Sequence, residues 1–283
     1  MGMDTQMDNR TDETIQIPAD ELKACCAALY ASDLARLLLG YSFHPGGLAL
    51  TERLGKLLNL EPGKRVLDVA TGRGTSAIFL AQRFGCEVFG VDYGSDSVRE
   101  ATRAAEASGI AHLARFEQGD AECLTSADEQ FDGVICECAF CTFPNKYAAA
   151  REFARVLRPG GKVGLTDLTR SGEVPPELQG LLAWIACIAD ARHVDEYAHY
   201  LEYAGLTVDH IEPHGDALSA MVYDIRTKLF AAELLVKLKQ IDLPSVDFDQ
   251  ARSLARAAAD AVKARRFGYT LFIATKPSIS LAT

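Results

Sequence analysis

The sequence predicts an α/β fold built on a mostly parallel, seven-stranded sheet, with helices ahead of the sheet and a helical insertion before the last strand. From residue 64 to residue 169, short apolar runs with β-branched residues alternate with stretches of helical apolar spacing. Such alternation is typical of parallel strands joined by helices. The glycine-containing turn TGRGT follows the first strand, and after Thr169 only two further strand-like runs lie among longer helical segments.

The first half of the chain supplies five of the expected strands. Residues 21–39 and 47–60 have helical spacing, and SFHPGG breaks the helix between them with a proline and two glycines. The strands are expected at 64–70, 86–92, 114–120, 131–138 and 162–169. The helices among them are expected at 76–84, 95–109 and 146–157.

The second half is mainly helical. Helices are expected at 175–191, 194–205, 217–240 and 246–266, with strands at 206–214 and 268–277. The sequence has no internal repeat and no long linker. We therefore expect a tail over 1–20, a helical cap over 21–60 and one main domain over 61–283, with a helical insertion at about 215–266.

Composition narrows the functional class. The formal net charge of the 283 residues is −10, which argues against a nucleic-acid-binding surface because such surfaces are usually basic. No apolar run approaches the roughly 20 residues that a membrane span needs. The polar, acidic start lacks the pattern of a secretory signal. These features lead us to expect a cytoplasmic protein with no membrane or nucleic-acid partner; its oligomeric state stays open.

The stretch VLDVATGRGTSA predicts a nucleoside-cofactor site. Gly72 and Gly74 lie between a strand and a helix, where glycines allow a sharp turn and a close approach of the backbone to a ligand. Asp92 ends the next strand, in the place of a carboxylate that accepts both ribose hydroxyls. A tight turn alone would explain the glycines less well. Because Ala77 completes a GxGxxA pattern, a dinucleotide-dependent dehydrogenase is an alternative.

Three features favour another cofactor. Asp68 precedes the first glycine by four residues and could face the cationic amino-acid end of a ligand. The stretch GDAECL follows the third strand, where an aspartate can reach an adenine amino group. The sheet closes with an extra strand after a long insertion. Together these resemble the class I S-adenosylmethionine-dependent methyltransferases, over about residues 60–170 plus the last strand.

That resemblance implies S-adenosyl-L-methionine as the cofactor. It places the loop glycines near the methionine part of the cofactor and the acid of the second strand at the ribose. The residues that it assigns to the cofactor are Asp68, Thr71, Gly72, Gly74, Asp92, Tyr93, Asp120 and Ala121.

Eight cysteines, at positions 25, 26, 86, 123, 136, 138, 141 and 187, form the second unusual feature. A reducing compartment disfavours disulfides, and the spacing does not fit a zinc finger. Three of the cysteines stand in ICECAFC, at the end of the fourth strand, which in this fold lies beside the transferable methyl group. They could simply fill space, but three together at a cofactor face favour a chemical role.

Further motifs resemble the arsenite methyltransferases. Cys138 is followed by Asn145–Lys146, Cys187 lies in the predicted helix after the fifth strand ahead of an AGL turn, and ELKACC carries Cys25 and Cys26. The resemblance implies that Cys138 and Cys187, joined by Cys26, Cys25 or Cys141, hold trivalent arsenic, which is thiophilic. The arsenic would then attack the methyl group directly. The region 34–58 and the ATGRG loop depart from that family's pattern.

Two other hypotheses stay open. The acceptor could be an organic small molecule, with the thiols as packing, or the chain could be a non-catalytic metalloid sensor. His44, Tyr30 and Tyr41 could contact a ligand but equally suit turns or helix packing. The same holds for four residues on the helices after the fifth strand, Trp184, His193, Tyr197 and Tyr200.

Overall fold

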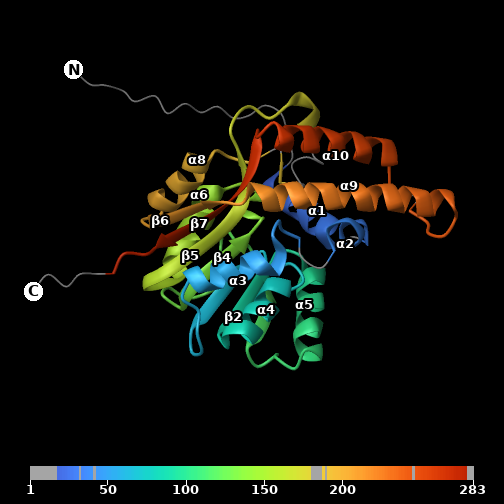
Figure 1. Cartoon of the computed structure of the whole chain (residues 1–283). Coiled ribbons are helices and arrows are strands. Elements are labelled where there is room, and N and C mark those ends of the chain that lie inside the picture. Colours follow the sequence, from blue (N-terminus) through green and yellow to red (C-terminus); the bar gives the residue numbers. More distant parts are fainter. Residues whose placement is uncertain are drawn as a thin grey trace, which may run out of the picture.

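A seven-stranded sheet forms the centre of the molecule (Figure 1). The structure is a computed structural model that describes residues 18–31, 33–40, 43–179, 187–188, 190–243 and 246–278. The strands lie in the order β3-β2-β1-β4-β5-β7-β6. Their bounds are β1 Arg65–Val69, β2 Glu87–Asp92, β3 Ala114–Gln118, β4 Phe131–Glu137, β5 Leu157–Arg170, β6 Thr207–Pro213 and β7 Phe267–Thr275. The pairs among β1 to β5 are parallel, and β7 runs antiparallel to both its neighbours. The predicted fold is confirmed.

Helices cover both faces of the sheet, so the central strands are buried along most of their length. On one face lie α3 (Gly47–Leu57), α4 (Thr75–Phe84) and α5 (Ser95–Ala107), and on the other lie α6 (Lys146–Val156) and α8 (Val194–Tyr203) (Figure 1). The packing between α3 and the sheet is close: a Cβ on Gly164 of β5 would lie 2.6 Å from the Leu54 side chain.

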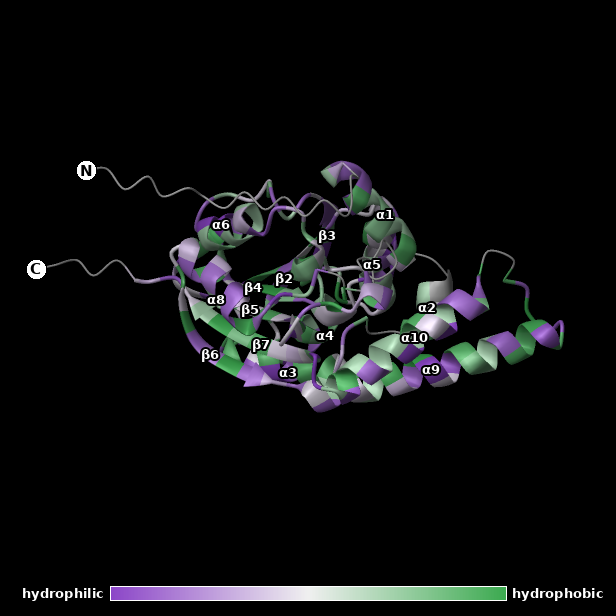
Figure 2. Cartoon of the chain, turned by 90° about the horizontal axis from the view of Figure 1, so that it is seen from above, coloured by the Kyte–Doolittle hydropathy of each residue, from purple (hydrophilic) through white to green (hydrophobic). Residues whose placement is uncertain are grey.

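Four further helices gather near the carboxyl ends of β4 and β5. At the start of the described chain are α1 (Ala19–Ala31) and α2 (Asp33–Leu39). The insertion forms α9 (Gly215–Lys237) and α10 (Phe248–Lys263), which pack side by side and extend well beyond the sheet (Figures 1 and 2). Because α2 packs against α9, the N-terminal helices and the insertion enclose one region.

Three predicted segments differ from the structure. The helix α1 begins at Ala19, inside the stretch assigned to the tail, whose residues 1–17 lie outside the described residues. The strand β5 includes the RPGG that was expected to precede it. The helix expected at 175–191 is wrong for its described part, which has only the short 3₁₀ helix η2 (Pro176–Leu178) and a turn at Cys187.

The backbone explains the last difference. Gln179 is extended, with φ −101° and ψ 145°, so η2 does not continue as a longer helix. Cys187 has a left-handed φ of 64°, which is incompatible with a right-handed helix. Residues 180–186 and 189 lie outside the described residues. Within the described ranges, no helix is both long enough and apolar enough to cross a membrane.

Candidate active site

The loop between β1 and α4 is shaped by left-handed residues. Ala70, Gly72 and Gly74 have φ values of 57°, 55° and 74°. A Cβ on Gly74 would lie 2.7 Å from the Phe116 ring, so only glycine fits there. A Cβ on Gly72 would have just Phe43 near it, at 3.9 Å. The backbone at Gly72 is therefore open to a ligand, while Gly74 is required by packing.

Asp92 joins this loop to the end of β2. Its Oδ2 accepts a hydrogen bond from the backbone N–H of Gly72 at 2.8 Å, and its Oδ1 accepts one from Gly94 at 2.8 Å. Burial raises the pKa of Asp92, although the two hydrogen bonds act in the opposite direction. The carboxylate thus lies at the open side of the glycine loop, where it can meet ribose hydroxyls.

Asp68 has a different place from the one expected. It is buried and accepts a hydrogen bond from the Thr71 hydroxyl at 2.6 Å. Burial raises its pKa to about 8, with a smaller contribution in the same direction from Glu137. Because Asp68 lies beneath the loop and lines no cavity described here, it supports Thr71 rather than facing a cationic ligand group.

A cavity lies between the glycine loop and the N-terminal helices. Gly72, Asp92 and Tyr93 line it from the sheet side, as expected. On the opposite side, the helix α1 contributes Lys23, Cys26, Ala27 and Tyr30 to the lining. Residues of α1 therefore form part of the wall of this cavity.

Two expected adenine contacts lie outside the lining of this cavity. The Asp120 carboxylate accepts hydrogen bonds from Lys23 at 2.8 Å and from the Glu122 N–H at 2.9 Å. Lys23 also bonds Glu122 at 2.6 Å. Ala121 packs against the core. Asp120 therefore fastens α1 in place instead of being directed at the cavity.

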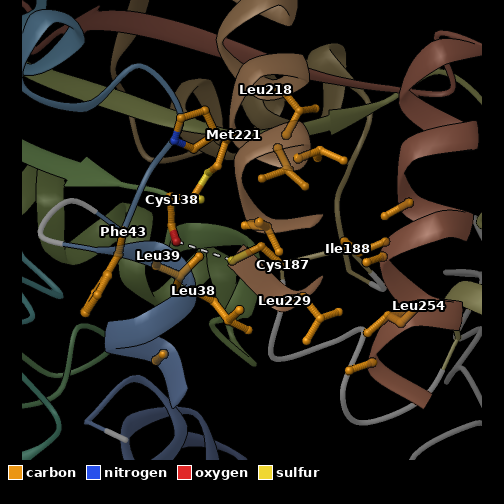
Figure 3. A pocket seen from close by; sticks show the side chains of 18 of the residues that line it. Leu38, Leu39, Phe43, Cys138, Cys187, Ile188, Leu218, Met221, Leu229 and Leu254 are labelled. Carbon is orange, nitrogen blue, oxygen red and sulfur yellow. Dashed lines mark hydrogen bonds between the residues drawn. The ribbon is translucent and has the colours of Figure 1, made fainter. Parts of the chain in front are cut away.

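A larger cavity of about 420 Å³ adjoins the first (Figure 3). Leucines and other aliphatic residues of α2, α9 and α10 form most of its wall. Figure 3 shows Leu38, Leu39, Leu218, Met221, Leu229 and Leu254 around it, with Cys138 and Cys187 on one side. Tyr30, Phe43 and Cys138 line both cavities and so mark their junction.

The cysteines of ICECAFC differ in burial. Cys136 and Cys141 are fully buried, and the Cys141 N–H donates to Asp167 at 2.8 Å. Cys138 lies at the junction, where its φ is 56°. The Sγ of Cys187 donates to the carbonyl oxygen of Cys138 at 3.3 Å and lies 3.5 Å from the Tyr30 hydroxyl. Left-handed φ values in two non-glycine residues, brought together at the junction, are typical of functional sites.

The environment of Cys187 favours the thiolate. Hydrogen bonds from Cys138, Cys141 and Tyr30, with the charge of Lys146, lower the pKa of Cys187 well below its ordinary value, although burial opposes the shift. The bond to the Cys138 carbonyl needs the protonated thiol, but it is one contact against three donors and a cation. The hydrogen bond to Cys187 and the charge of its thiolate, together with burial, raise the pKa values of Cys138 and Cys141.

The two N-terminal cysteines, Cys25 and Cys26, differ in their place relative to the cavities. Cys26 lines the cofactor cavity, and burial raises its pKa to about 12. Cys25 lines neither cavity. In the part of the chain that the structure describes, no three His, Cys, Asp or Glu side chains are spaced to hold a metal ion. A trigonal thiolate site from Cys26, Cys138 and Cys187 is thus not preassembled.

The other candidates have mainly structural contacts. Tyr197 donates to the Leu168 carbonyl at 2.7 Å, Tyr200 stacks edge-on against Tyr147, and His193 caps α8. Tyr41 and Trp184 lie outside the described residues. Reasoning from the sequence missed Glu137 and Phe43, which line the cofactor cavity. An acidic residue at the end of the fourth strand was the available signal for Glu137.

The fold and the site together define a class I S-adenosylmethionine-dependent methyltransferase, and S-adenosylmethionine is its cofactor. The observed residues fit this cofactor: an open glycine backbone, a carboxylate at the end of β2 and a covering helix surround one cavity. When bound, the cofactor supplies an electrophilic methyl group on a sulfonium. The chain belongs to the family described as "Methyltransferase domain", which matches residues 60–205.

Curated relatives support the assignment. Methyltransferase GfsG of Streptomyces halstedii is 27% identical over 82% of this chain and 81% of its own length. The 27-O-demethylrifamycin SV methyltransferase of Amycolatopsis mediterranei is 30% identical over 81% of this chain and 83% of its own. An arsenite methyltransferase of Halobacterium salinarum is 31% identical over 56% of this chain and 41% of its own. The chain spans less than half the length of the plant phosphoethanolamine N-methyltransferases it matches.

Solved structures share the fold. Phosphoethanolamine N-methyltransferase 2 of Haemonchus contortus, in complex with S-adenosyl-L-methionine, has a TM-score of 0.76 at 17% identity, over 91% of this chain and 60% of that one. A geranyl diphosphate C-methyltransferase of Streptomyces coelicolor has a TM-score of 0.73 at 15% identity, over 92% of this chain and 99% of that one.

Proposed function

We propose that this methyltransferase acts on an organic small molecule with an extended apolar body. The observation that carries the proposal is the aliphatic cavity of about 420 Å³, which meets the cofactor cavity at Tyr30, Phe43 and Cys138. An acceptor whose apolar part fills this cavity would present its nucleophile at that junction. Positioning of this kind accounts for much of the rate in a displacement reaction.

The charge of the cavity wall argues against an anionic acceptor. Among its described residues there is no Lys, Arg or His, and the one carboxylate, Asp247, caps α10 by accepting from the Gln250 N–H. A phosphate-bearing acceptor would need cationic donors. The relatives named for phosphoethanolamine therefore differ from this chain in the acceptor that we propose. The rifamycin relative is named for an organic acceptor that fits the cavity's character better.

Arsenite is the second candidate, favoured by the sulfur atoms at the junction. Cys138 and Cys141 hydrogen-bond Cys187, and Cys26 is close enough for Cys187 to influence its pKa. The arsenite methyltransferase relative adds support. Against it, arsenite is far smaller than the cavity, and the described thiols would have to rearrange to bind it together.

A methyl-transfer assay separates the two candidates. Purified protein and S-adenosylmethionine would be incubated with geraniol, dodecylamine, a macrolide aglycone, phosphoethanolamine, or arsenite with glutathione. Mass spectrometry would detect S-adenosylhomocysteine and the methylated product. We expect turnover with apolar organic acceptors. Turnover with arsenite alone, lost in both Cys138→Ser and Cys187→Ser, would instead establish the second candidate.

Cavity filling supplies the matched control. Met221→Trp puts an indole into the large cavity and should reduce organic turnover at least tenfold, with unchanged affinity for S-adenosylhomocysteine. Leu234→Trp alters the same helix at a position that is 48% exposed and should leave turnover unchanged. Equal activity of the two variants would contradict the proposed acceptor site.

A further inference from the structure

Glu137 is a buried acid at the end of β4 that no part of the sequence analysis assigned. Its side chain is 4% exposed, and it lines the cofactor cavity but not the larger apolar cavity. Because Glu137 lines only the cofactor cavity while its neighbour Cys138 lines both cavities, Glu137 lies on the cofactor side of the junction.

Three elements hold its carboxylate. Ser76, at the start of α4, donates to Oε2 at 2.6 Å, and Thr51 of α3 donates to Oε1 at 3.2 Å and to Oε2 at 3.1 Å. The Nε2 of His44 lies 3.5 Å from Oε2. Because Ser76 stands two residues after Gly74, these bonds place Glu137 beside the glycine loop, where the methionine end of the cofactor lies in this class.

Among the described residues, His44 is the one basic side chain that lies near this carboxylate. Within the described residues no Lys or Arg forms an ion pair with Glu137, and its hydrogen bonds come from hydroxyls. Burying a carboxylate without a counter-charge is costly. A glutamine would accept the same hydroxyl donors at a lower cost, so the charge itself has a use only when a cationic ligand arrives.

The other acids near this cavity are already engaged. Asp92 accepts from two backbone N–H groups, Asp68 is beneath Thr71, and Asp120 and Glu122 bind Lys23. The methionine end of S-adenosylmethionine carries an ammonium group. We propose that Glu137, held by Ser76, Thr51 and His44, binds this α-ammonium group and so positions the sulfonium at the junction with the acceptor cavity.

The test compares two ligands that differ in the amino-acid part. S-adenosylhomocysteine has the ammonium group, and 5′-methylthioadenosine keeps the nucleoside but lacks it. Titration calorimetry, in displacement mode for the weaker ligand, would measure both dissociation constants. Glu137→Gln should weaken S-adenosylhomocysteine about tenfold to a hundredfold, the range for one charge-assisted hydrogen bond, and change methylthioadenosine less than twofold.

Two variants check the interpretation. Asp92→Asn should weaken both ligands, because both contain the ribose. Glu137→Asp keeps the charge and should recover part of the affinity for S-adenosylhomocysteine, which a purely structural role would not do. Glu137→Gln should also unfold at or above the wild-type temperature without ligand, since it removes a buried charge.

Unchanged binding of S-adenosylhomocysteine in Glu137→Gln, with methyl transfer lost, would overturn the proposal and place Glu137 on the acceptor side. An equal loss for both ligands in that variant would overturn it too, because a distorted loop explains that result. This inference rests on the cofactor and not on the acceptor proposed above, so failure of one does not affect the other.

Discussion

At the scale of single residues, the burial of Asp68 couples folding to pH. Its pKa of about 8 in the folded protein exceeds that of an exposed aspartate, near 4, so the folded state keeps a proton that the unfolded state has lost. The free energy of unfolding should therefore fall as pH rises from about 4 to about 8, by up to roughly 1.4 kcal/mol per pH unit from this group.

Asp68→Asn should remove this contribution, because the amide still accepts from Thr71 but does not titrate. Urea unfolding between pH 5 and pH 8 would measure the free energies of unfolding of both proteins. The stability of the variant relative to wild type should increase as the pH rises. Asp132→Asn is the control: the pKa of Asp132 is lowered, so both states are ionised across this range and the difference should stay flat. A flat difference for Asp68→Asn would contradict the prediction.

Cys187 should be the reactive thiol of the junction. Since its lowered pKa keeps a thiolate at pH values where an ordinary thiol is protonated, iodoacetamide should label it near pH 6.5 faster than the buried Cys86, whose pKa is raised to about 11. Tyr30→Phe removes one hydrogen-bond donor and should raise the apparent pKa of Cys187. Peptide mass spectrometry across a pH series would follow both effects.

Tyr197→Phe tests whether the loss of any nearby phenol has the same effect. Its hydroxyl donates to the Leu168 carbonyl rather than to the Cys187 sulfur. The labelling profile of Cys187 should therefore shift in Tyr30→Phe and keep its wild-type midpoint in Tyr197→Phe. Identical labelling profiles in wild type and Tyr30→Phe would show that the Tyr30 hydroxyl does not lower the pKa of Cys187.

At the scale of elements, α1 lies against the cofactor cavity and is held there by the bonds of Lys23 to Asp120 and Glu122. Lys23→Met should weaken S-adenosylhomocysteine by about 1–2 kcal/mol, near tenfold, and make the affinity less sensitive to salt. Lys56→Met, which breaks an exposed pair with Glu52, should change neither quantity. Wild-type affinity in Lys23→Met would mean that α1 is held by other contacts.

Elements also show where reasoning from sequence works and where it stops. Buried parallel strands such as β1 and β4 are mainly apolar, and this pattern predicted all seven strands. The apolar composition of the stretch after Thr169 suits a helix, whereas the extended Gln179 and the left-handed Cys187 interrupt one. Such a turn is fixed by contacts with neighbouring elements, and the spacing of apolar residues along the chain does not predict it.

At the scale of the whole molecule, the cofactor side of the site was more predictable than the acceptor side. Gly72 and Asp92 come from a loop and a strand end whose relation the fold fixes. The acceptor cavity is enclosed by α2, which ends at Leu39, and by α9 and α10, which begin only at Gly215 and Phe248. Its shape depends on how these helices pack, which local sequence patterns do not determine.

The position of β7 has a consequence for synthesis of the protein. This strand follows all the others in the chain, yet it lies between β5 and β6, and in the described sheet β6 has no other neighbour. While the ribosome is still making α9 and α10, β5 has an open edge and β6 has no partner. The nascent chain therefore carries exposed strand edges until Phe267–Thr275 has emerged, which makes this interval the time when a chaperone matters most.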